Sequence, residues 1–164
     1  MSPDAFQALL HRFTTAAEAG DGAAFAACFT QDAVYHDYIY GDHAGRASIA
    51  HMMSDLFHRD AGPDYRWQMF DPVCGGSLAY ASSLSSFTSR VPEFAGRRVV
   101  IDGISRFELQ GGLISDYRES VNGGLAMVQL GVAPARLEKV LQRWSRQLIE
   151  QPATQAFLRR PKGC

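Results

Sequence analysis

Cysteine is scarce in this chain of 164 residues, and the three present, Cys28, Cys74 and Cys164, share no CxxC spacing. Their number and spacing predict neither a disulfide framework nor a cysteine metal site. Cys28 and Cys74 lie in apolar segments and are predicted to be small buried hydrophobes rather than reactive thiols. Cys164 is the last residue of the sequence and is placed to form an intermolecular disulfide in air.

Long apolar runs and an excess of charge of either sign are also missing. No apolar run approaches the roughly 20 residues that a membrane-spanning helix needs. No leader peptide is recognisable where Ser2-Pro3-Asp4 runs into a helical pattern. With 16 basic and 17 acidic residues the formal net charge is −1, which attracts neither nucleic acid nor an anionic membrane. We therefore expect a cytoplasmic protein with no membrane and no nucleic-acid partner.

Signatures of cofactor and metal binding are missing too. The sequence has no Gly-rich phosphate loop, no nucleotide-binding fingerprint and no nucleophile elbow, so we expect no cofactor. His51, Asp55 and His58 share one face of a predicted helix, but only His51 and Asp55 have the i, i+4 spacing of helical zinc ligands. A solvated polar face explains the same residues, and we expect no metal.

The composition that is present, 46% hydrophobic and 20% charged, predicts one globular domain with a substantial core. Helical patterns come first. Ser2 and Pro3 are typical of a helix start, and Gly20 is typical of a helix end. The next segments are predicted as a short helix, a strand, a loop and a helix: 21–29, 33–39, 41–45 and 46–57.

From residue 65 the pattern changes to β. Four strands separated by short Gly- or Pro-containing turns are predicted: 65–73, 78–90, 97–109 and 113–122. Long strands joined by short turns form an antiparallel meander. Because the helices precede the strands instead of alternating with them, the fold class is predicted as α+β.

The last part of the chain is predicted to be helical. A short helix around 125–130 is followed by an amphipathic helix that begins at Pro134. The apolar stripe of this helix is typical of core or of a dimer interface: Leu137, Val140, Leu141, Trp144 and Leu148. We expect a single domain over residues 1–150 and a frayed tail over residues 151–164.

The order of these elements resembles the nuclear transport factor 2-like superfamily over roughly residues 5–131. The resemblance rests on Gly20-Asp21-Gly22, on the segment 29–34, and on Gly45-Arg46 at a helix start. Leu113–Glu119 and Gln129-Leu130-Gly131 resemble segments of SnoaL-like polyketide cyclases and, for the first, of limonene-epoxide hydrolases.

The resemblance implies a cone, in which a curved, mostly antiparallel sheet wraps around the N-terminal helices, with a pocket at its open end. The amphipathic helix that begins at Pro134 is then an extra C-terminal helix beyond the matched residues. We expect a homodimer through the outer sheet face and the C-terminal helix. The fold does not settle the function, because the same superfamily hosts isomerases, dehydratases, cyclases, hydrolases and non-enzymes.

The same resemblance implies candidate catalytic residues. Glu119 matches the acid of the cyclases and of the hydrolases. Asp37 falls where ketosteroid isomerases keep their general base and where the hydrolases keep a water-positioning asparagine. Tyr35 matches a tyrosine of the hydrolases in the same strand.

Departures from the resemblance exclude two activities. The isomerases' oxyanion-hole tyrosine falls at Phe13 and their second acid near Gly103. The hydrolases' Arg-x-Asp falls at Ser86 and Thr88. Steroid isomerisation and epoxide hydrolysis by these mechanisms are therefore not expected, and the cyclase match survives best.

The residues themselves support acid–base chemistry but leave alternatives open. Glu119 shares its strand face with Tyr117 and Val121, and apolar surroundings raise the pKa of a carboxyl toward the range useful for proton transfer. A salt bridge from Glu119 to a neighbouring arginine such as Arg106 is the alternative. Asp37, on the inward face, is expected to remove a proton or orient a water, or else to bond the following loop.

Other candidates surround these acids. Tyr35 is a potential donor to an oxyanion or an ordinary strand aromatic, and His43, in the loop, is a further acid–base candidate. The expected apolar lining residues of the pocket are Phe13, Met52, Met53, Trp67, Met69, Tyr117 and Val121. Two hydroxyls, of Ser86 and Thr88, are expected to position a polar oxygen or a water. Each apolar member is also a candidate for plain core, and together they imply a small apolar ligand.

Two hypotheses follow from this sequence. The first is a SnoaL-like, cofactor-independent enzyme that cyclises, isomerises or dehydrates a small apolar carbonyl or polyketide-like compound, with Glu119 as principal acid/base. The second is a non-catalytic ligand-binding or assembly domain that keeps the family's pocket.

Overall fold

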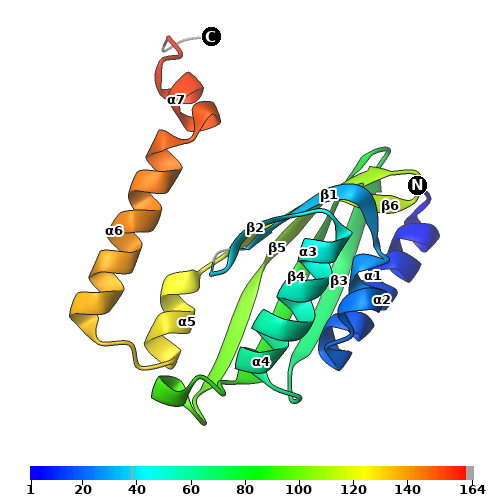
Figure 1. Ribbon diagram of the computed structural model, residues 1–164. Coiled ribbons are helices and arrows are strands. Elements are labelled where there is room, and N and C mark those ends of the chain that lie inside the picture. Colours follow the sequence, from blue (N-terminus) through cyan, green and yellow to red (C-terminus); the bar gives the residue numbers. More distant parts are fainter. Residues whose placement is uncertain (38, 162–164) are drawn as a thin grey trace. The chain divides into compact units, whose positions relative to one another are not determined.

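A computed structural model describes residues 1–37 and 39–161 of the protein (Figure 1). Cys164, with its predicted reactivity, lies outside these residues. The described chain forms two compact units, Met1–Leu130 and a second that begins at Gly131. None of the helices that the structure describes is long and apolar enough to cross a membrane.

The N-terminal helix α1, Pro3–Ala19, begins and ends at the expected signals. The Ser2 side chain accepts a hydrogen bond from the Ala5 amide at 3.2 Å, and Gly20 ends the helix in the left-handed region at φ +67°. Asp21 caps helix α2, Gly22–Ala26, through the Ala24 amide at 2.9 Å. These caps satisfy amides that have no partner within a helix, and so fix where each helix starts.

Six strands form one sheet in the order β2-β1-β6-β5-β4-β3. Their bounds are Phe29–Asp37, Gly41–Ala44, Arg66–Gly75, Leu78–Thr88, Arg98–Gln110 and Leu113–Val121, for β1 to β6. All neighbours are antiparallel except β1 and β6, which run parallel. The α+β class is confirmed. Strand β2 stands where the sequence predicted a loop, because it pairs with β1 from Val34 to Asp37.

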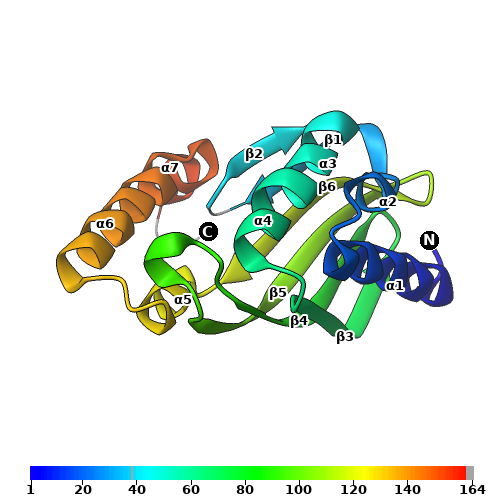
Figure 2. The ribbon, with the colours of Figure 1, turned by 60° about the horizontal axis from the view of Figure 1, so that its bottom comes forward.

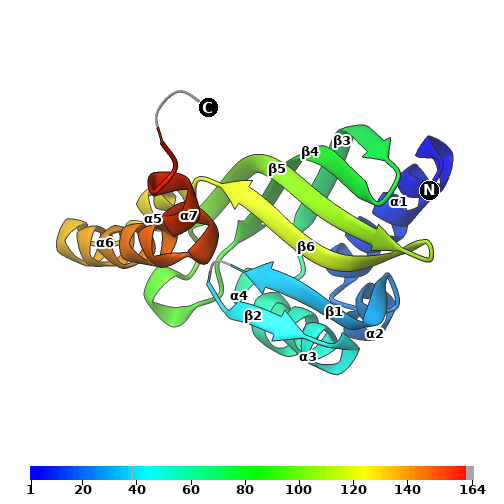
Figure 3. The ribbon, with the colours of Figure 1, turned by 90° about the horizontal axis from the view of Figure 1, so that it is seen from above.

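One further helical stretch crosses the same face of the sheet as α1 and α2 (Figures 2 and 3). It consists of α3, Arg46–His51, a π-helical segment, Met52–Phe57, and α4, His58–Ala61. A short 3₁₀ turn at Pro92–Phe94 lies between β4 and β5. The curved sheet and the helices on its inner face give the expected cone-type fold.

The core lies between these helices and the inner face of the sheet. Phe13 is fully buried at its centre, and its ring contacts five other aromatic rings. The ring centroids lie 4.6 to 5.9 Å from that of Phe13: Phe25, Phe29, Trp67, Phe107 and Tyr117. Aromatic pairs at such distances add specific contacts to the burial of apolar area.

After the sheet come α5, Gly123–Gln129, in the first unit, and α6, Pro134–Glu150, and α7, Pro152–Leu158, in the second. The predicted amphipathic helix from Pro134 is confirmed. The predicted frayed tail is wrong for Pro152–Leu158, because Pro152 occupies the first helical position, where its fixed φ favours a new helix. The single domain over 1–150 stays a prediction.

Candidate active site

The pairing of β1 with β6 brings the two predicted acids onto neighbouring strands. Tyr35 is the register partner of Tyr117, and their rings stack with centroids 4.7 Å apart. Residues two apart on a strand point to the same face. Asp37 and Glu119, each two residues beyond a stacked tyrosine, therefore follow these rings on the inner face, toward the carboxyl ends of both strands.

Among the described residues, Glu119 has one side-chain hydrogen bond, which it accepts from the Tyr117 hydroxyl at 3.2 Å. That hydroxyl also lies 2.9 Å from the buried Ser105 hydroxyl. Burial, reinforced by the negative charge of Asp37, raises the pKa of Glu119 to about 7, which the hydrogen bond from Tyr117 opposes. At neutral pH this carboxyl therefore exists in both protonation states.

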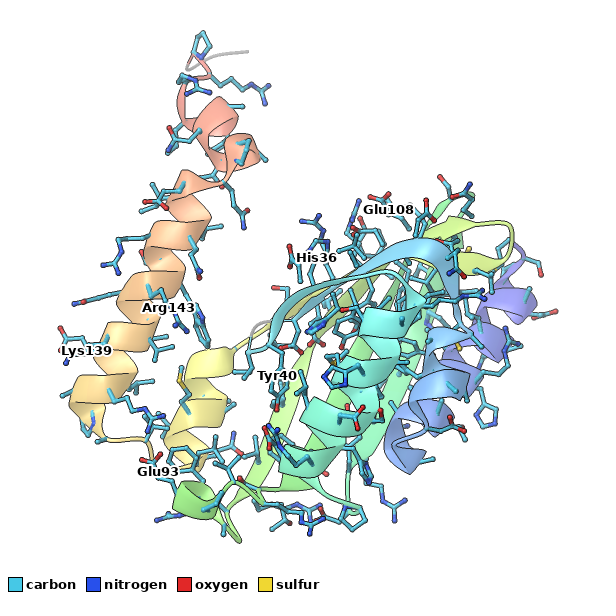
Figure 4. All side chains as sticks on the ribbon, in the orientation of Figure 1. His36, Tyr40, Glu93, Glu108, Lys139 and Arg143 are labelled. Carbon is cyan, nitrogen blue, oxygen red and sulfur yellow. The ribbon has the colours of Figure 1, made fainter. Side chains whose placement is uncertain are left out.

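The alternative salt bridge between Glu119 and Arg106 is wrong. Arg106 bonds Glu108 at 2.6 Å and lies 3.6 Å from Asp116. Glu108 projects from the side of the sheet opposite to the helices, as does His36 (Figure 4). His36 bonds Asp116 at 2.9 Å and points away from the inner face, because residues adjacent on a strand point to opposite faces.

Asp37 is partly fixed by the turn that follows it. Its Oδ1 atom accepts hydrogen bonds from the backbone amides of Ile39 at 2.6 Å and Tyr40 at 2.7 Å. This is the alternative predicted for Asp37, in which it bonds the loop that follows. Burial raises the pKa of Asp37, while these two hydrogen bonds and His43 oppose the rise. The Tyr40 hydroxyl donates to Asp60 in α4 at 2.7 Å, so the turn is tied to that helix (Figure 4).

Three buried phenols surround the acids, and one of them was missed from the sequence. Tyr35, Tyr65 and Tyr117 are each 5% exposed or less. Burial raises the pKa of all three, and the charge of Glu119 acts on each in the same direction. The missed residue is Tyr65, whose alternation with Trp67 could have placed it on the inner face. We call Tyr35, Asp37, Tyr65, Tyr117 and Glu119 the acid–phenol cluster.

His43 lies in β2 and not in a loop. It is directly opposite Tyr35 in the β1–β2 register and is 9% exposed. Its Nδ1 atom is 3.1 Å from the Ser48 hydroxyl in α3. Its Nε2 atom is buried and has no hydrogen-bond partner in the described part of the chain.

Most of the predicted lining residues belong to the core. Phe13, Met52, Met53 and Trp67 are 6% exposed or less, and Met69 packs against them half-buried. Val121 alone, half-buried, continues the strand face of Glu119 toward solvent. Phe13 and Trp67 contact the ring of Tyr117, which is fully buried and itself contacts Glu119.

The predictions for Ser86 and Thr88 as inward hydroxyls are wrong. Ser86 accepts a hydrogen bond from Arg98 at 3.1 Å, and Thr88 donates to Asp64 at 2.6 Å. Strand β4 buries its odd-numbered residues Ala79, Ala81 and Ser83, so the even positions face outward. Serines occupy both faces of this strand, and their alternation could not reveal which face is inner.

The three residues of the metal alternative do not converge. His51 pairs with Asp55 at 3.0 Å on an exposed surface. The His58 ring lies so close to Gly20 that an added Cβ there would be 2.5 Å from the ring. Within residues 1–37 and 39–161 no group of three or more potential metal ligands is found.

Comparison with known proteins gives a family and a fold. The family model for the SnoaL-like domain matches residues 10–117. No curated protein matches the sequence. TsrD from Streptomyces laurentii is similar in structure, with 18% identity, a TM-score of 0.69, and coverage of 81% of this chain and 99% of that one.

Two more similar structures belong to proteins that are named for an activity. A putative polyketide cyclase from Xanthomonas campestris pv. campestris is 20% identical, with a TM-score of 0.63 and coverage of 77% of this chain and 97% of its own. An LEH-like epoxide hydrolase from M. tuberculosis is 16% identical, with a TM-score of 0.60 and coverage of 75% and 86%. At these identities the likeness shows the fold alone.

Proposed function

The chain belongs to the SnoaL-like domain family, and from this we propose that it is a cofactor-independent acid–base enzyme acting on a small apolar carbonyl or polyketide-like compound. Cyclisation, isomerisation and dehydration share the proton transfers that such an enzyme performs. The observation that carries the proposal is Glu119, an enclosed carboxyl with a pKa of about 7. General acid–base catalysis is most efficient when the pKa lies near the working pH.

The mechanism begins with the ionised form of Glu119. Its carboxylate takes a proton from the carbon next to the carbonyl, and the electron pair of that C–H bond moves onto the carbonyl oxygen as an enolate. Tyr35 donates a hydrogen bond to this developing oxyanion. The neutral Glu119 then returns the proton to a carbon or to a leaving hydroxyl group. Asp37 orients a water or serves as partner base.

The proposal predicts that the protein catalyses exchange of the carbonyl-adjacent protons of a small ketone in D₂O. Proton NMR measures this exchange, with 2-tetralone, an uncharged bicyclic ketone, as the substrate. The Glu119→Gln protein is expected to lose about 10²- to 10⁴-fold of the catalysed rate, because the amide cannot take up the proton. The control is Glu108→Gln, which changes a glutamate paired with Arg106 on the outer face. Equal rates for wild type and Glu119→Gln would contradict the assignment.

A binding or assembly domain is the second candidate, and the burial of the expected lining favours it. Phe13, Met52, Met53 and Trp67 fill the inside of the cone as core. A hollow of about 460 Å³ beside α1, lined in part by Arg12 and by the residues of the β5–β6 turn, contains no member of the acid–phenol cluster. In this case wild type exchanges protons no faster than buffer, and Glu119→Gln still binds the ketone.

We also propose that the protein forms a homodimer through the outer face of its sheet. Exposed apolar side chains lie on adjacent strands of this face, β3, β4 and β5: Phe70, Tyr80, Leu84, Val100 and Ile104. An exposed sheet face with several large apolar residues is typical of an interface.

The dimer proposal predicts that Ile104→Lys shifts the protein toward monomer. Ile104 is 55% exposed, so the change costs the fold little while it places a charge in the interface. Sedimentation velocity measures the shift, and Ala19→Lys, an exposed position of α1, is the control. A wild type that is monomeric at all concentrations, or an unchanged Ile104→Lys dimer, would refute this interface.

A further inference from the structure

His43 holds a buried ring nitrogen that has no partner. Its Nε2 atom is one of two such side-chain atoms in the part of the chain that the structure describes, the other being His58 Nδ1. Buried polar groups in folded proteins are nearly always hydrogen-bonded, and an unpaired one lowers stability. A ligand bound at this edge of the candidate site would supply the hydrogen-bond partner that the ring nitrogen lacks.

The strand register places the His43 ring at the acid–phenol cluster. Tyr35 pairs with His43 and Asp37 pairs with Gly41 in the antiparallel β1–β2 hairpin. Residues directly opposite in such a pair lie on the same face of the sheet. His43 therefore stands beside Tyr35, on the face that carries Asp37, and it acts electrostatically on the Asp37 carboxyl.

The orientation of the ring is fixed from the other side. Nδ1 is within hydrogen-bond distance of the Ser48 hydroxyl, at 3.1 Å in α3. In a neutral imidazole one nitrogen donates and the other accepts. Whichever role Nδ1 takes with Ser48, Nε2 has the opposite one, and it can donate to a carbonyl oxygen or accept from an enol hydroxyl.

The charges around the cluster decide what kind of molecule fits. Among the residues described, no arginine or lysine forms an ion pair with Asp37 or Glu119. Arg106 and Arg118 pair instead with Asp116 on the outer face. A bound anion would face two carboxyls without a compensating arginine or lysine among the described residues, and this repulsion selects against it.

We propose that His43 Nε2 is a ligand-contacting group of the acid–phenol cluster, and that the ligand is an uncharged carbonyl compound bound in its keto or enol form. This inference rests on the proposed function, which gives the location of the site. It adds the residue that contacts the ligand and the charge of that ligand. It holds equally if the domain binds the compound without transforming it.

The test uses NMR of the full-length protein with ¹⁵N-labelled histidine side chains, titrated with 2-tetralone. The His43 Nε2 signal is expected to shift on binding, and the His58 Nδ1 signal, from the other unpaired histidine, is expected to stay in place. An unshifted His43 refutes the contact, whether or not the ketone binds elsewhere, and so does an equal shift of His58. The tautomer read from the same spectra distinguishes the keto from the enol contact.

Variants and a charged probe complete the test. His43→Gln is expected to weaken the affinity for 2-tetralone at least about tenfold, with His58→Gln as matched control. At pH 8, 2-naphthoate, an anion of similar size, is expected not to compete with the ketone, and equal binding of the two overturns the charge class. If Glu119→Gln abolishes exchange while His43→Gln binds normally, the proposed function stands and this inference falls.

Discussion

At pH 8 the Glu119→Gln protein is expected to be more stable than wild type by about 2 kcal/mol, although it has lost the proposed general base. Enclosure raises the pKa of Glu119 from 4.5 to about 7. Because one pKa unit corresponds to about 1.4 kcal/mol, the full shift gives about 3 kcal/mol, and the partial exposure of the side chain reduces this value. Removing the charge removes the destabilisation.

The sign of the pH dependence follows from the raised pKa. Between pH of about 4.5 and 7 the folded protein holds a proton at Glu119 that the unfolded chain has released. The free energy of unfolding of wild type therefore falls as pH rises through this range, and the Glu119→Gln protein lacks this component. Below the lower value both proteins carry a neutral group and differ little.

Urea denaturation at pH 4 and at pH 8 measures both quantities. The Glu108→Gln protein is the control, because Glu108 is exposed and paired with Arg106 on the outer face. A Glu119→Gln protein that is no more stable than wild type at pH 8 would show that the carboxyl is solvated well enough to keep its ordinary pKa. In that case the acid–base role loses its main physical support.

Phe13→Ala is expected to lower the free energy of unfolding by about 3–5 kcal/mol, the range for truncating a buried aromatic ring. Phe13 is fully buried and its ring contacts five other aromatic rings. The cavity left behind is bounded by helices and the sheet, which cannot both collapse into it. Urea denaturation at a single pH measures the loss.

The matched control is Phe157→Ala in α7, where the side chain is 69% exposed and a change within about 0.5 kcal/mol is expected. Phe13→Leu keeps most of the volume and is expected to fall between the two. A loss below about 1 kcal/mol for Phe13→Ala would show that the ring lines an open space and not a packed core, and it would revive Phe13 as a ligand contact.

The sequence predicted local structure best at positions where the residue type itself favours one backbone conformation or one capping hydrogen bond. Ser2 and Gly20 marked the ends of α1 through local hydrogen bonding and backbone conformation. Glu119 stood out mainly because the resemblance places a catalytic acid there, and because an acid among apolar strand neighbours is costly to bury without a purpose. The helix ends depend on a few adjacent residues, and the structure bears out their local geometry.

The inferences that failed needed information from distant parts of the chain. Ser86 and Thr88 were placed on the wrong face because serines on both sides of β4 hide the alternation. Tyr65 was missed because its proximity to Glu119 comes from the curvature of the folded sheet and not from sequence spacing. The buried, unpaired nitrogen of His43 is likewise visible only once α3 packs on β2.

The parallel pairing of β1 with β6 has a consequence for the folding of the protein during its synthesis. During synthesis Asp37 leaves the ribosome long before Glu119, and contacts between such distant segments form late because loop closure opposes them. The two acids can meet only after β5 and β6 have folded back and docked beside β1. Chains that end before β6 therefore lack the paired acids, and the mutual electrostatic effect of these acids reports that β6 has docked beside β1.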